Sequence, residues 1–141
     1  MNELLESRPA AIDSPFRLDG RVAVITGGAG KLGAQFAGAI IEAGGAVVLL
    51  DIDAARLDKT RARLAASDKG VEPMGIRCDI TQPEDIARAC EQILKSRSRI
   101  DILINNAANN PQVGDAGMED KAQHWSRLES FPVAVWNADM A

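Results

Sequence analysis

A cluster of glycines between an apolar run and an amphipathic segment constrains the fold of this chain most. Residues 22–25 read Val-Ala-Val-Ile, which is typical of a strand buried on both faces. The spacing G-x-G-x-x-G follows at Gly28, Gly30 and Gly33. Apolar residues then recur at helical spacing before Gly44-Gly45, namely Leu32, Phe36, Ala39, Ile40 and Ala43. A strand, a glycine loop and a helix in this order form the context in which the spacing is informative.

The glycine spacing predicts a binding site for a dinucleotide. Gly28 and Gly30 lack a Cβ atom, so the backbone can turn tightly and approach a pyrophosphate. The helix that opens at Lys31 and Leu32 would offer that anion N–H groups and a partial positive charge. Gly33 would allow the helix to pack closely on the strand. A tight turn without a ligand is the alternative interpretation of these glycines.

An aspartate after the second apolar run indicates which dinucleotide is bound. Asp51 follows the apolar run 46–50, about 20 residues after the glycine loop. A carboxylate at this point accepts both hydroxyls of an adenosine ribose and repels a 2′-phosphate, so we expect NAD rather than NADP. Two alternatives stay open: Lys31 could attract an NADP phosphate instead of pointing into solvent, and Asp51 could simply cap the next segment.

The remaining apolar runs predict the fold class. Runs 46–50, 74–78 and 100–104 are expected strands that alternate with helical patterns. Solid apolar runs indicate a parallel sheet covered on both faces, with right-handed crossovers. We therefore predict an α/β, Rossmann-type doubly wound sheet that is incomplete, with about four strands in the order 3-2-1-4. A mobile N-terminal arm is expected over 1–19, ending in a turn at Asp19-Gly20, and the dinucleotide-binding domain over 20–141.

Three further helices are expected. The segment 54–67 reads as a charged surface helix with Leu57 and Leu64 on its inner face. Thr81 and Glu84 have the spacing of a capping box and predict a helix start. The expected inner stripe of this helix is Ile86, Ala89, Cys90, Ile93 and Leu94. A last helical pattern begins in 131–140, with Ser130 as its expected N-cap.

Composition excludes several classes of protein. The chain has 141 residues, of which 46% are hydrophobic and 26% charged, as in an ordinary globular protein of one domain. Its formal net charge of −4 and its lack of basic runs argue against nucleic-acid or membrane partners. Two cysteines and one histidine, His124, without metal-type spacing indicate no metal site and no disulfide scaffold. We expect a reducing, cytoplasmic compartment.

Four segments, taken in order, resemble the short-chain dehydrogenase/reductase family over about residues 16–141. They are the lead-in 16–27, Asp51, the run 78–81 (Cys-Asp-Ile-Thr) and the run 105–108 (Asn-Asn-Ala-Ala), the last similar to N-N-A-G. The resemblance implies that Asp79 and Ile80 border the adenine. It also implies that Asn105, Ala107 and Ala108 border the ribose side. Gly27 and Ile52 complete the expected cofactor-binding set.

Two departures from the family pattern bear on mechanism. The commonest family loop is T-G-x-x-x-G-x-G, whereas this chain fits T-G-x-x-G-x-x-G and has Lys31 in place of a glycine. Catalysis in the family depends on a Y-x-x-x-K pair, whose tyrosine exchanges a proton with the substrate oxygen during hydride transfer. This chain contains no tyrosine, so we assign no catalytic residue and expect a sequence that stops before the catalytic pair.

Three functions follow in order of preference. The first is the NAD-binding portion of a short-chain oxidoreductase that transfers hydride between the nicotinamide and an alcohol or carbonyl substrate. That substrate is expected only where a catalytic half is present. The second is a non-catalytic dinucleotide-binding module or subunit. A methyltransferase is the third, and the run 105–108 argues against it because acidic or aromatic residues usually occupy that position.

The incomplete sheet predicts an exposed edge. Beside the first strand, the run 100–104 would have one side unpaired, with apolar residues along it. We therefore expect a chain that is marginally stable, that associates with a partner or with itself, or that belongs to a longer polypeptide.

Overall fold

A computed structural model describes residues 16–66, 72–108 and 133 of the chain. Residues up to Asn106 belong to one compact unit, and Ala107, Ala108 and Val133 belong to a second. Most of the expected arm over 1–19 lies outside the described residues, as do His124, Ser130 and nearly all of the expected last helix. These expectations therefore stay predictions.

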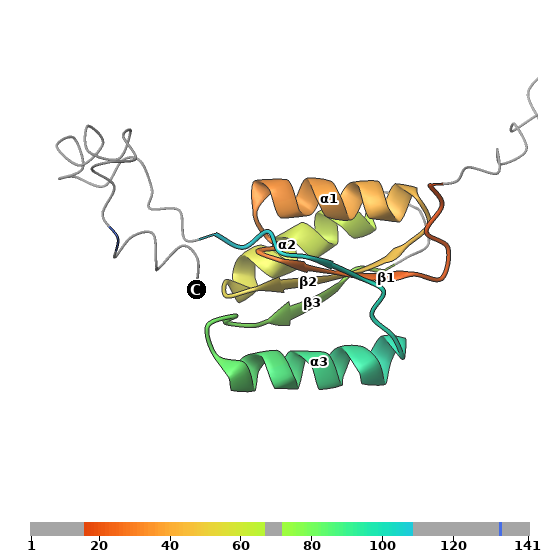
Figure 1. Cartoon of the computed structure of the whole chain (residues 1–141). Coiled ribbons are helices and arrows are strands. Elements are labelled where there is room, and N and C mark those ends of the chain that lie inside the picture. Colours follow the sequence, from red (N-terminus) through yellow and green to blue (C-terminus); the bar gives the residue numbers. More distant parts are fainter. Residues whose placement is uncertain (1–15, 67–71, 109–132, 134–141) are drawn as a thin grey trace, which may run out of the picture. The chain divides into compact units, whose positions relative to one another are not determined.

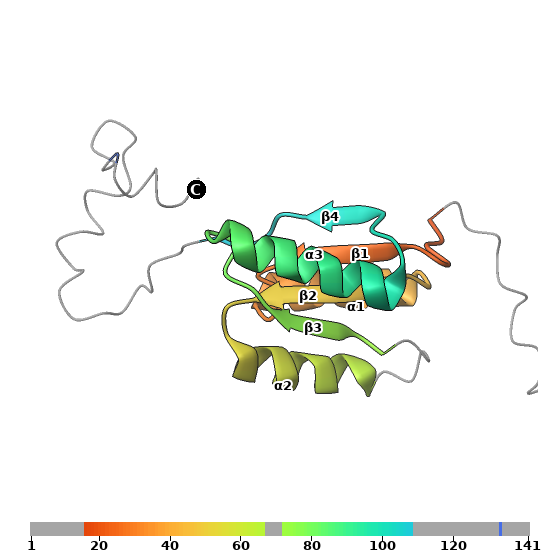
Figure 2. The same ribbon diagram turned by 90° about the horizontal axis from the view of Figure 1, so that it is seen from below.

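Four parallel strands form one sheet in the order β3-β2-β1-β4, which confirms the predicted fold class (Figure 1). Strands and helices alternate along the chain, as a parallel sheet requires. The elements are β1 (Val22–Thr26), α1 (Lys31–Glu42), β2 (Ala46–Asp51), α2 (Ala54–Ala65), β3 (Met74–Arg77), α3 (Pro83–Arg97) and β4 (Ile102–Ile104). Helices α1 and α2 cover one face of the sheet and α3 covers the other (Figures 1 and 2).

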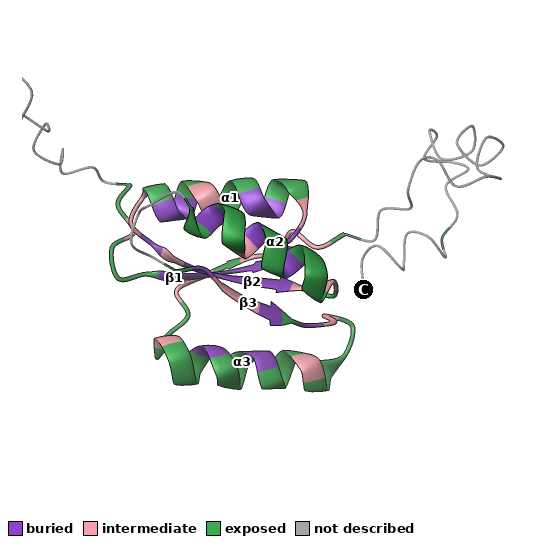
Figure 3. Cartoon of the chain, turned by 180° about the vertical axis from the view of Figure 1, so that it is seen from behind, coloured by how far each residue is buried: buried purple, intermediate pink, exposed green. Residues whose placement is uncertain are grey.

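The apolar runs of β1 and β2 supply both halves of the core. Successive side chains of a strand point to opposite faces, so Ala23 and Ile25 join the cluster that also contains residues of α1 and α2. Val22 and Val24 join the opposite cluster, to which α3 contributes Ala89 and Ile93. All of these side chains are buried (Figure 3). In the described part of the chain, no helix is long and apolar enough to cross a membrane.

The buried face of α1 differs from the predicted stripe. Leu32 and Phe36 are 59% and 41% exposed, although their spacing predicted a core position. The helix instead buries mainly small residues, namely Gly33, Ala34, Ala37, Ile40 and Ile41. Small residues lie inward because the helix approaches the preceding loop closely: a Cβ atom on Gly33 would lie 2.5 Å from the carbonyl oxygen of Gly27.

Two predictions about α3 were wrong. Three residues of the predicted inner stripe, Ile86, Cys90 and Leu94, are exposed rather than part of the core. The helix buries only a narrow face centred on Ala89 and Ile93. The predicted capping box does not form, because the helix begins at Pro83, with Gln82 as an N-cap whose side chain accepts no hydrogen bond. Proline suits the first helical position, where no N–H is needed, and this shifts the helix start away from Thr81.

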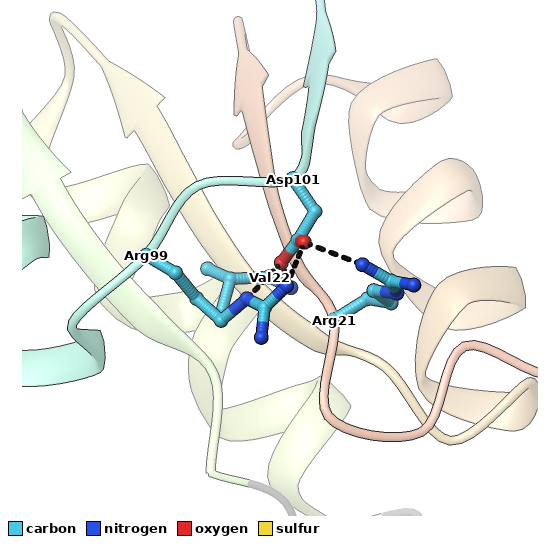
Figure 4. A network of polar contacts seen from close by, with 4 residues as sticks. All are labelled: Arg21, Val22, Arg99 and Asp101. Carbon is cyan, nitrogen blue, oxygen red and sulfur yellow. Dashed lines mark hydrogen bonds and ion pairs between the residues drawn. The ribbon is translucent and has the colours of Figure 1, made fainter.

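At the amino ends of the strands, opposite the glycine loop, Asp101 joins the beginnings of β4 and β1 (Figure 4). One carboxylate oxygen accepts the backbone N–H of Val22 at 2.9 Å, and the other accepts from Arg21 at 3.0 Å. Arg99 donates to both oxygens. The side chain of Asp101 is only 11% exposed. The hydrogen bond from Arg99, followed by that from Val22, holds the pKa of Asp101 well below its usual range.

We predict that Asp101→Asn lowers the free energy of unfolding at neutral pH. A carboxyl whose pKa is depressed in the folded state contributes stability above its unfolded pKa of about 4, and this contribution is lost as the pH falls further. The deficit of the variant should therefore be largest near pH 7 and shrink below pH 4. Urea titrations across this range measure it, with Asp58→Asn as a control because the Asp58 side chain is 78% exposed. An equal deficit at pH 3 and pH 7 would contradict the assignment.

We predict opposite effects of alanine at two glycines of α1. Gly33→Ala places a Cβ atom against the backbone of Gly27 and Gly28, so it should destabilise the fold by about 1–3 kcal/mol. Gly38→Ala meets no atom within 4 Å and should stabilise the helix by up to about 1 kcal/mol. Thermal melts of both variants compare the two signs directly. If Gly33→Ala were as stable as the natural chain, the close approach of α1 to the loop would be disproved.

Candidate functional site

Four segments meet at one edge of the sheet, beyond the carboxyl ends of the strands. Parallel strands end at the same edge, and ligands of open α/β sheets bind there. The registers pair Thr26 with Leu50, and Asp51 with Arg77, so the loops after β1, β2 and β3 begin at neighbouring levels. β4 joins them through the pair Ile25 and Ile104. Among the predicted site residues, those up to Asn105 lie at this edge.

The glycine loop leaves β1 in a tight turn that is fastened to β2. Gly27 has a φ of +60°, a conformation that favours glycine, and its carbonyl oxygen accepts the N–H of Gly30 at 3.0 Å. The N–H of Gly28 donates to the carbonyl oxygen of Leu50 at 2.9 Å. A Cβ atom on Gly28 would lie 2.7 Å from the Cβ atom of Leu49. Gly28 therefore keeps the loop pressed against β2, in addition to its predicted role toward an anion.

The first turn of α1 presents its backbone N–H groups at this edge. The helix begins at Lys31, and its N-cap Gly30 supplies no side-chain hydrogen bond. The first intrahelical hydrogen bond runs from the N–H of Ala34 to the carbonyl oxygen of Gly30, so the preceding N–H groups have no helical partner. No acidic residue lies in the first turn, and Lys31 and Leu32 are exposed. The arrangement suits an anion that accepts hydrogen bonds from backbone N–H groups.

Asp51 is fixed against the glycine loop through both carboxylate oxygens. Oδ2 accepts the N–H of Ala29 at 3.0 Å, and Oδ1 accepts the N–H of Asp53 at 3.1 Å. Each oxygen of an ionised carboxylate can accept a further hydrogen bond, so the group retains capacity for ribose hydroxyls. Ile52, next along the chain, is 58% exposed. Asp51 and the glycine loop therefore form one bonded unit.

The loop after β3 contains a second ordered carboxylate. Asp79 accepts two hydrogen bonds from Thr81, at 3.0 Å from the N–H and 2.7 Å from the hydroxyl. The hydroxyl bond, followed by the backbone bond, lowers the pKa of Asp79. Its own N–H donates to Asp85 at 3.0 Å, which fastens the loop to the first turn of α3. Ile80 is half-buried and packs on the α3 side of the core.

Cys78 precedes this loop and belongs to the core. Its side chain is 2% exposed, and burial raises the pKa of its thiol. Packing in the core is therefore the role that the structure shows for Cys78. No group of histidine, cysteine or carboxylate side chains in residues 16–66, 72–108 and 133 could hold a metal ion.

Asn106 joins β4 to the glycine loop, although the predicted site residues include its neighbour Asn105 instead. Its Nδ2 atom donates to the carbonyl oxygens of Thr26 and Gly27, at 3.0 and 3.2 Å. Its backbone N–H donates to the hydroxyl of Thr26 at 3.0 Å. The predicted neighbour Asn105 is exposed. The doubled asparagine after the fourth strand was the available signal, but spacing alone does not tell which of the two faces the loop.

Ala107 and Ala108 belong to the second unit of the chain, so their predicted place beside the ribose stays a prediction. The geometry brings together the loops after β1, β2, β3 and β4, with Asp51 and Asn106 bonded to the glycine loop.

Comparison with known proteins agrees with this architecture. The D-threitol dehydrogenase of Mycolicibacterium smegmatis is 32% identical over 104 residues, which cover 74% of this chain and 39% of that protein. The crystal structure of an NAD⁺-bound xylitol dehydrogenase superposes with a TM-score of 0.63 at 28% identity, over 89% of this chain and 48% of the other. The C-domain of a bacterial malonyl-CoA reductase, solved with NADP, gives a TM-score of 0.61 at 34% identity, over 66% of this chain and 15% of the other.

These matches identify the family of the chain and show how much of each relative it covers. The chain covers less than half of the length of each of these proteins. Its residues 21–132 match the family described as short chain dehydrogenase, and this span includes all four strands and the whole glycine loop. The chain therefore belongs to the short-chain dehydrogenase family.

Proposed function

We propose that this chain is the dinucleotide-binding part of a short-chain oxidoreductase and that it prefers NAD. The observation that carries the proposal is the bonded unit of glycine loop, uncapped α1 terminus and Asp51. The pyrophosphate would lie against the loop at Gly28 and Gly30, on the N–H groups of Lys31 and Leu32. When bound, the nicotinamide cofactor supplies or accepts a hydride.

Asp51 supports the preference for NAD. Its carboxylate already accepts hydrogen bonds from the N–H groups of Ala29 and Asp53, which hold it beside the glycine loop. A 2′-phosphate beside it would bring like charges together, whereas ribose hydroxyls would donate to it. Lys31 is exposed, and Asp51 is held at the loop by backbone N–H groups.

The other predicted residues complete the proposed site. Asp79 and Ile80 would border the adenine, with Ile52 beside them, and Asn105, Ala107 and Ala108 would border the ribose side. Gly27 and Gly33 would shape the loop rather than contact the ligand, because both lie close to backbone atoms of the glycine loop itself. NAD⁺ is bound by the similar xylitol dehydrogenase and NADP by the malonyl-CoA reductase domain, so the relatives support a nicotinamide dinucleotide of either kind.

The proposal assigns hydride transfer to residues that this chain does not contain. The chain has no tyrosine, and the family reaction uses a tyrosine to exchange a proton with an alcohol or carbonyl substrate. We further propose a reducing, cytoplasmic setting, because Cys78 and Cys90 are not joined in a disulfide. A homo-oligomer is the expected assembly if no other polypeptide covers the sheet edge.

We predict that Asp51→Ala weakens NAD binding by about 1–3 kcal/mol, because charge-assisted hydrogen bonds to the ribose are lost. The loss of the like-charge repulsion should narrow the difference between NAD and NADP. Calorimetric titration of the 141-residue chain with each dinucleotide measures both effects.

Asp58→Ala is the matched control, since it removes an exposed carboxylate of α2 outside the site. A thermal melt of each variant separates lost binding from lost folding. Unchanged NAD affinity in a folded Asp51→Ala variant would disprove the ribose assignment, and no binding of either dinucleotide by the natural chain would disprove the proposed function.

A further inference from the structure

The loop between β3 and α3 is held by hydrogen bonds on both of its sides. On the β2 side, the N–H of Cys78 donates to the carbonyl oxygen of Asp51 at 2.9 Å. Within the loop, the N–H of Gln82 donates to the carbonyl oxygen of Asp79 at 3.0 Å. On the α3 side, the N–H of Asp79 donates to Oδ2 of Asp85 at 3.0 Å. The side chain of Asp85 therefore joins the backbone of this loop to the helix.

The carboxylate of Asp85 is held on its second oxygen as well. Oδ1 accepts a hydrogen bond from Arg88, about one turn further along α3, at 2.6 Å. The side chain of Asp85 is 17% exposed. The hydrogen bond from Asp79, followed by that from Arg88, lowers the pKa of Asp85, so this carboxyl is ionised at neutral pH. The N–H of Asp79 is therefore bound to a charged acceptor whose orientation is fixed from its other side.

The carboxylate of Asp79 has one oxygen available beyond the hydrogen bonds of the loop. The N–H and the hydroxyl of Thr81 both donate to Oδ1, at 3.0 and 2.7 Å. The residue is half-buried, and Oδ2 has the capacity to accept from a ligand. An ionised carboxylate only accepts hydrogen bonds. It therefore favours a ligand that donates an N–H at that point and opposes a ligand that presents an oxygen.

We propose that Asp85 is a positioning residue for recognition of the nucleobase. By holding the backbone of Asp79, it allows the Asp79 carboxylate to select a base with an amino group over a base with a carbonyl group. The inference rests on the proposed function, in which Asp79 borders the adenine. Adenine has a 6-amino group, which donates, whereas hypoxanthine has a carbonyl oxygen at the same place. Asp85 does not touch the base and acts through Asp79.

Selection of the base depends on this contact because the ribose is held by a different residue. In the proposed site Asp51 binds the ribose, and the base is attached to that ribose. β3 ends at Arg77, and Cys78 is the last residue of this segment that donates to the backbone of Asp51. Asp79 is the next residue, so its position is set by the loop and by Asp85. A displacement of Asp79 would move its carboxylate away from the 6-amino group and leave the ribose contact in place.

Glu84 provides a matched control for the charge of Asp85. Both residues lie in the first turn of α3, where a negative charge interacts favourably with the helix dipole. Glu84 is exposed, and the hydrogen bond from the loop goes to Asp85 instead. Glu84→Ala therefore removes a charge from the same turn and keeps the contact with Asp79. Comparison of the two variants separates the effect of charge at the helix end from the effect of the hydrogen bond.

The test is calorimetric titration of the 141-residue chain with NAD and with nicotinamide hypoxanthine dinucleotide. We expect the natural chain to bind NAD about tenfold more tightly, which is the effect of about one hydrogen bond. Asp85→Ala should weaken NAD binding and reduce this preference to about twofold. Glu84→Ala should leave the preference unchanged. Asp85→Asn retains an oxygen that can accept from Asp79, so it should keep most of the preference.

Two further measurements relate binding to structure. Hydrogen exchange at the amide of Asp79 should be faster in Asp85→Ala than in the natural chain or in Asp85→Asn. Thermal melts show whether each variant folds. If Asp85→Ala does not fold, Arg88→Ala takes its place, because it releases only the second oxygen of Asp85 and should reduce the preference in part.

Several outcomes would overturn the role of Asp85 and leave NAD binding standing. They are no preference for NAD in the natural chain, an unchanged preference in the folded Asp85→Ala variant, an equal loss in Glu84→Ala, or a loss in Asp85→Asn as large as in Asp85→Ala. If the natural chain binds neither dinucleotide, the proposed function fails and this inference fails with it.

Discussion

Helix α1 packs directly on the loop that precedes it, and the other segments of the site depend on this contact. Gly33 allows the approach, since any larger residue would meet the carbonyl oxygen of Gly27. The loop is thereby held where Asp51 can accept from Ala29 and Asn106 can donate to Gly27. Each of these bonds joins a different strand end to one loop. A displacement of α1 would therefore reach the loops after β2 and β4 together.

The carboxyl and amino ends of the strands are stabilised by different physical interactions. At the carboxyl ends of the strands, backbone groups and single carboxylates share hydrogen bonds, and the first N–H groups of α1 have no partner within the helix. At the amino ends of the strands, the nearly buried carboxylate of Asp101 accepts hydrogen bonds from two arginines and a backbone N–H. That cluster fixes the start of β4 relative to β1, so the short strand is bonded at Asp101 before it and at Asn106 after it.

The sequence was sufficient for the sheet and for the positions of most loops, because both follow from apolar runs and glycines, which are local signals. It was less informative about which helix faces are buried. Leu32, Phe36 and Cys90 have helical spacing and apolar character, yet they are exposed because the faces that pack are chosen by close approach and by the extent of the sheet. Asn106 was missed for a related reason: its partners Thr26 and Gly27 are some 80 residues away, and only the folded sheet brings them together.

Dinucleotide binding and catalysis require different kinds of chemical groups. The proposed dinucleotide site uses backbone N–H groups, tight turns and one carboxylate, all supplied by the loops that follow the strands. Proton transfer to a substrate needs a side chain whose pKa is tuned by neighbours, such as the tyrosine and lysine of the family. Such tuning needs charges packed around the reacting group, whereas the proposed site would hold the pyrophosphate with backbone dipoles and the ribose with one carboxylate. Dinucleotide binding and proton transfer therefore place different demands on the residues around each site.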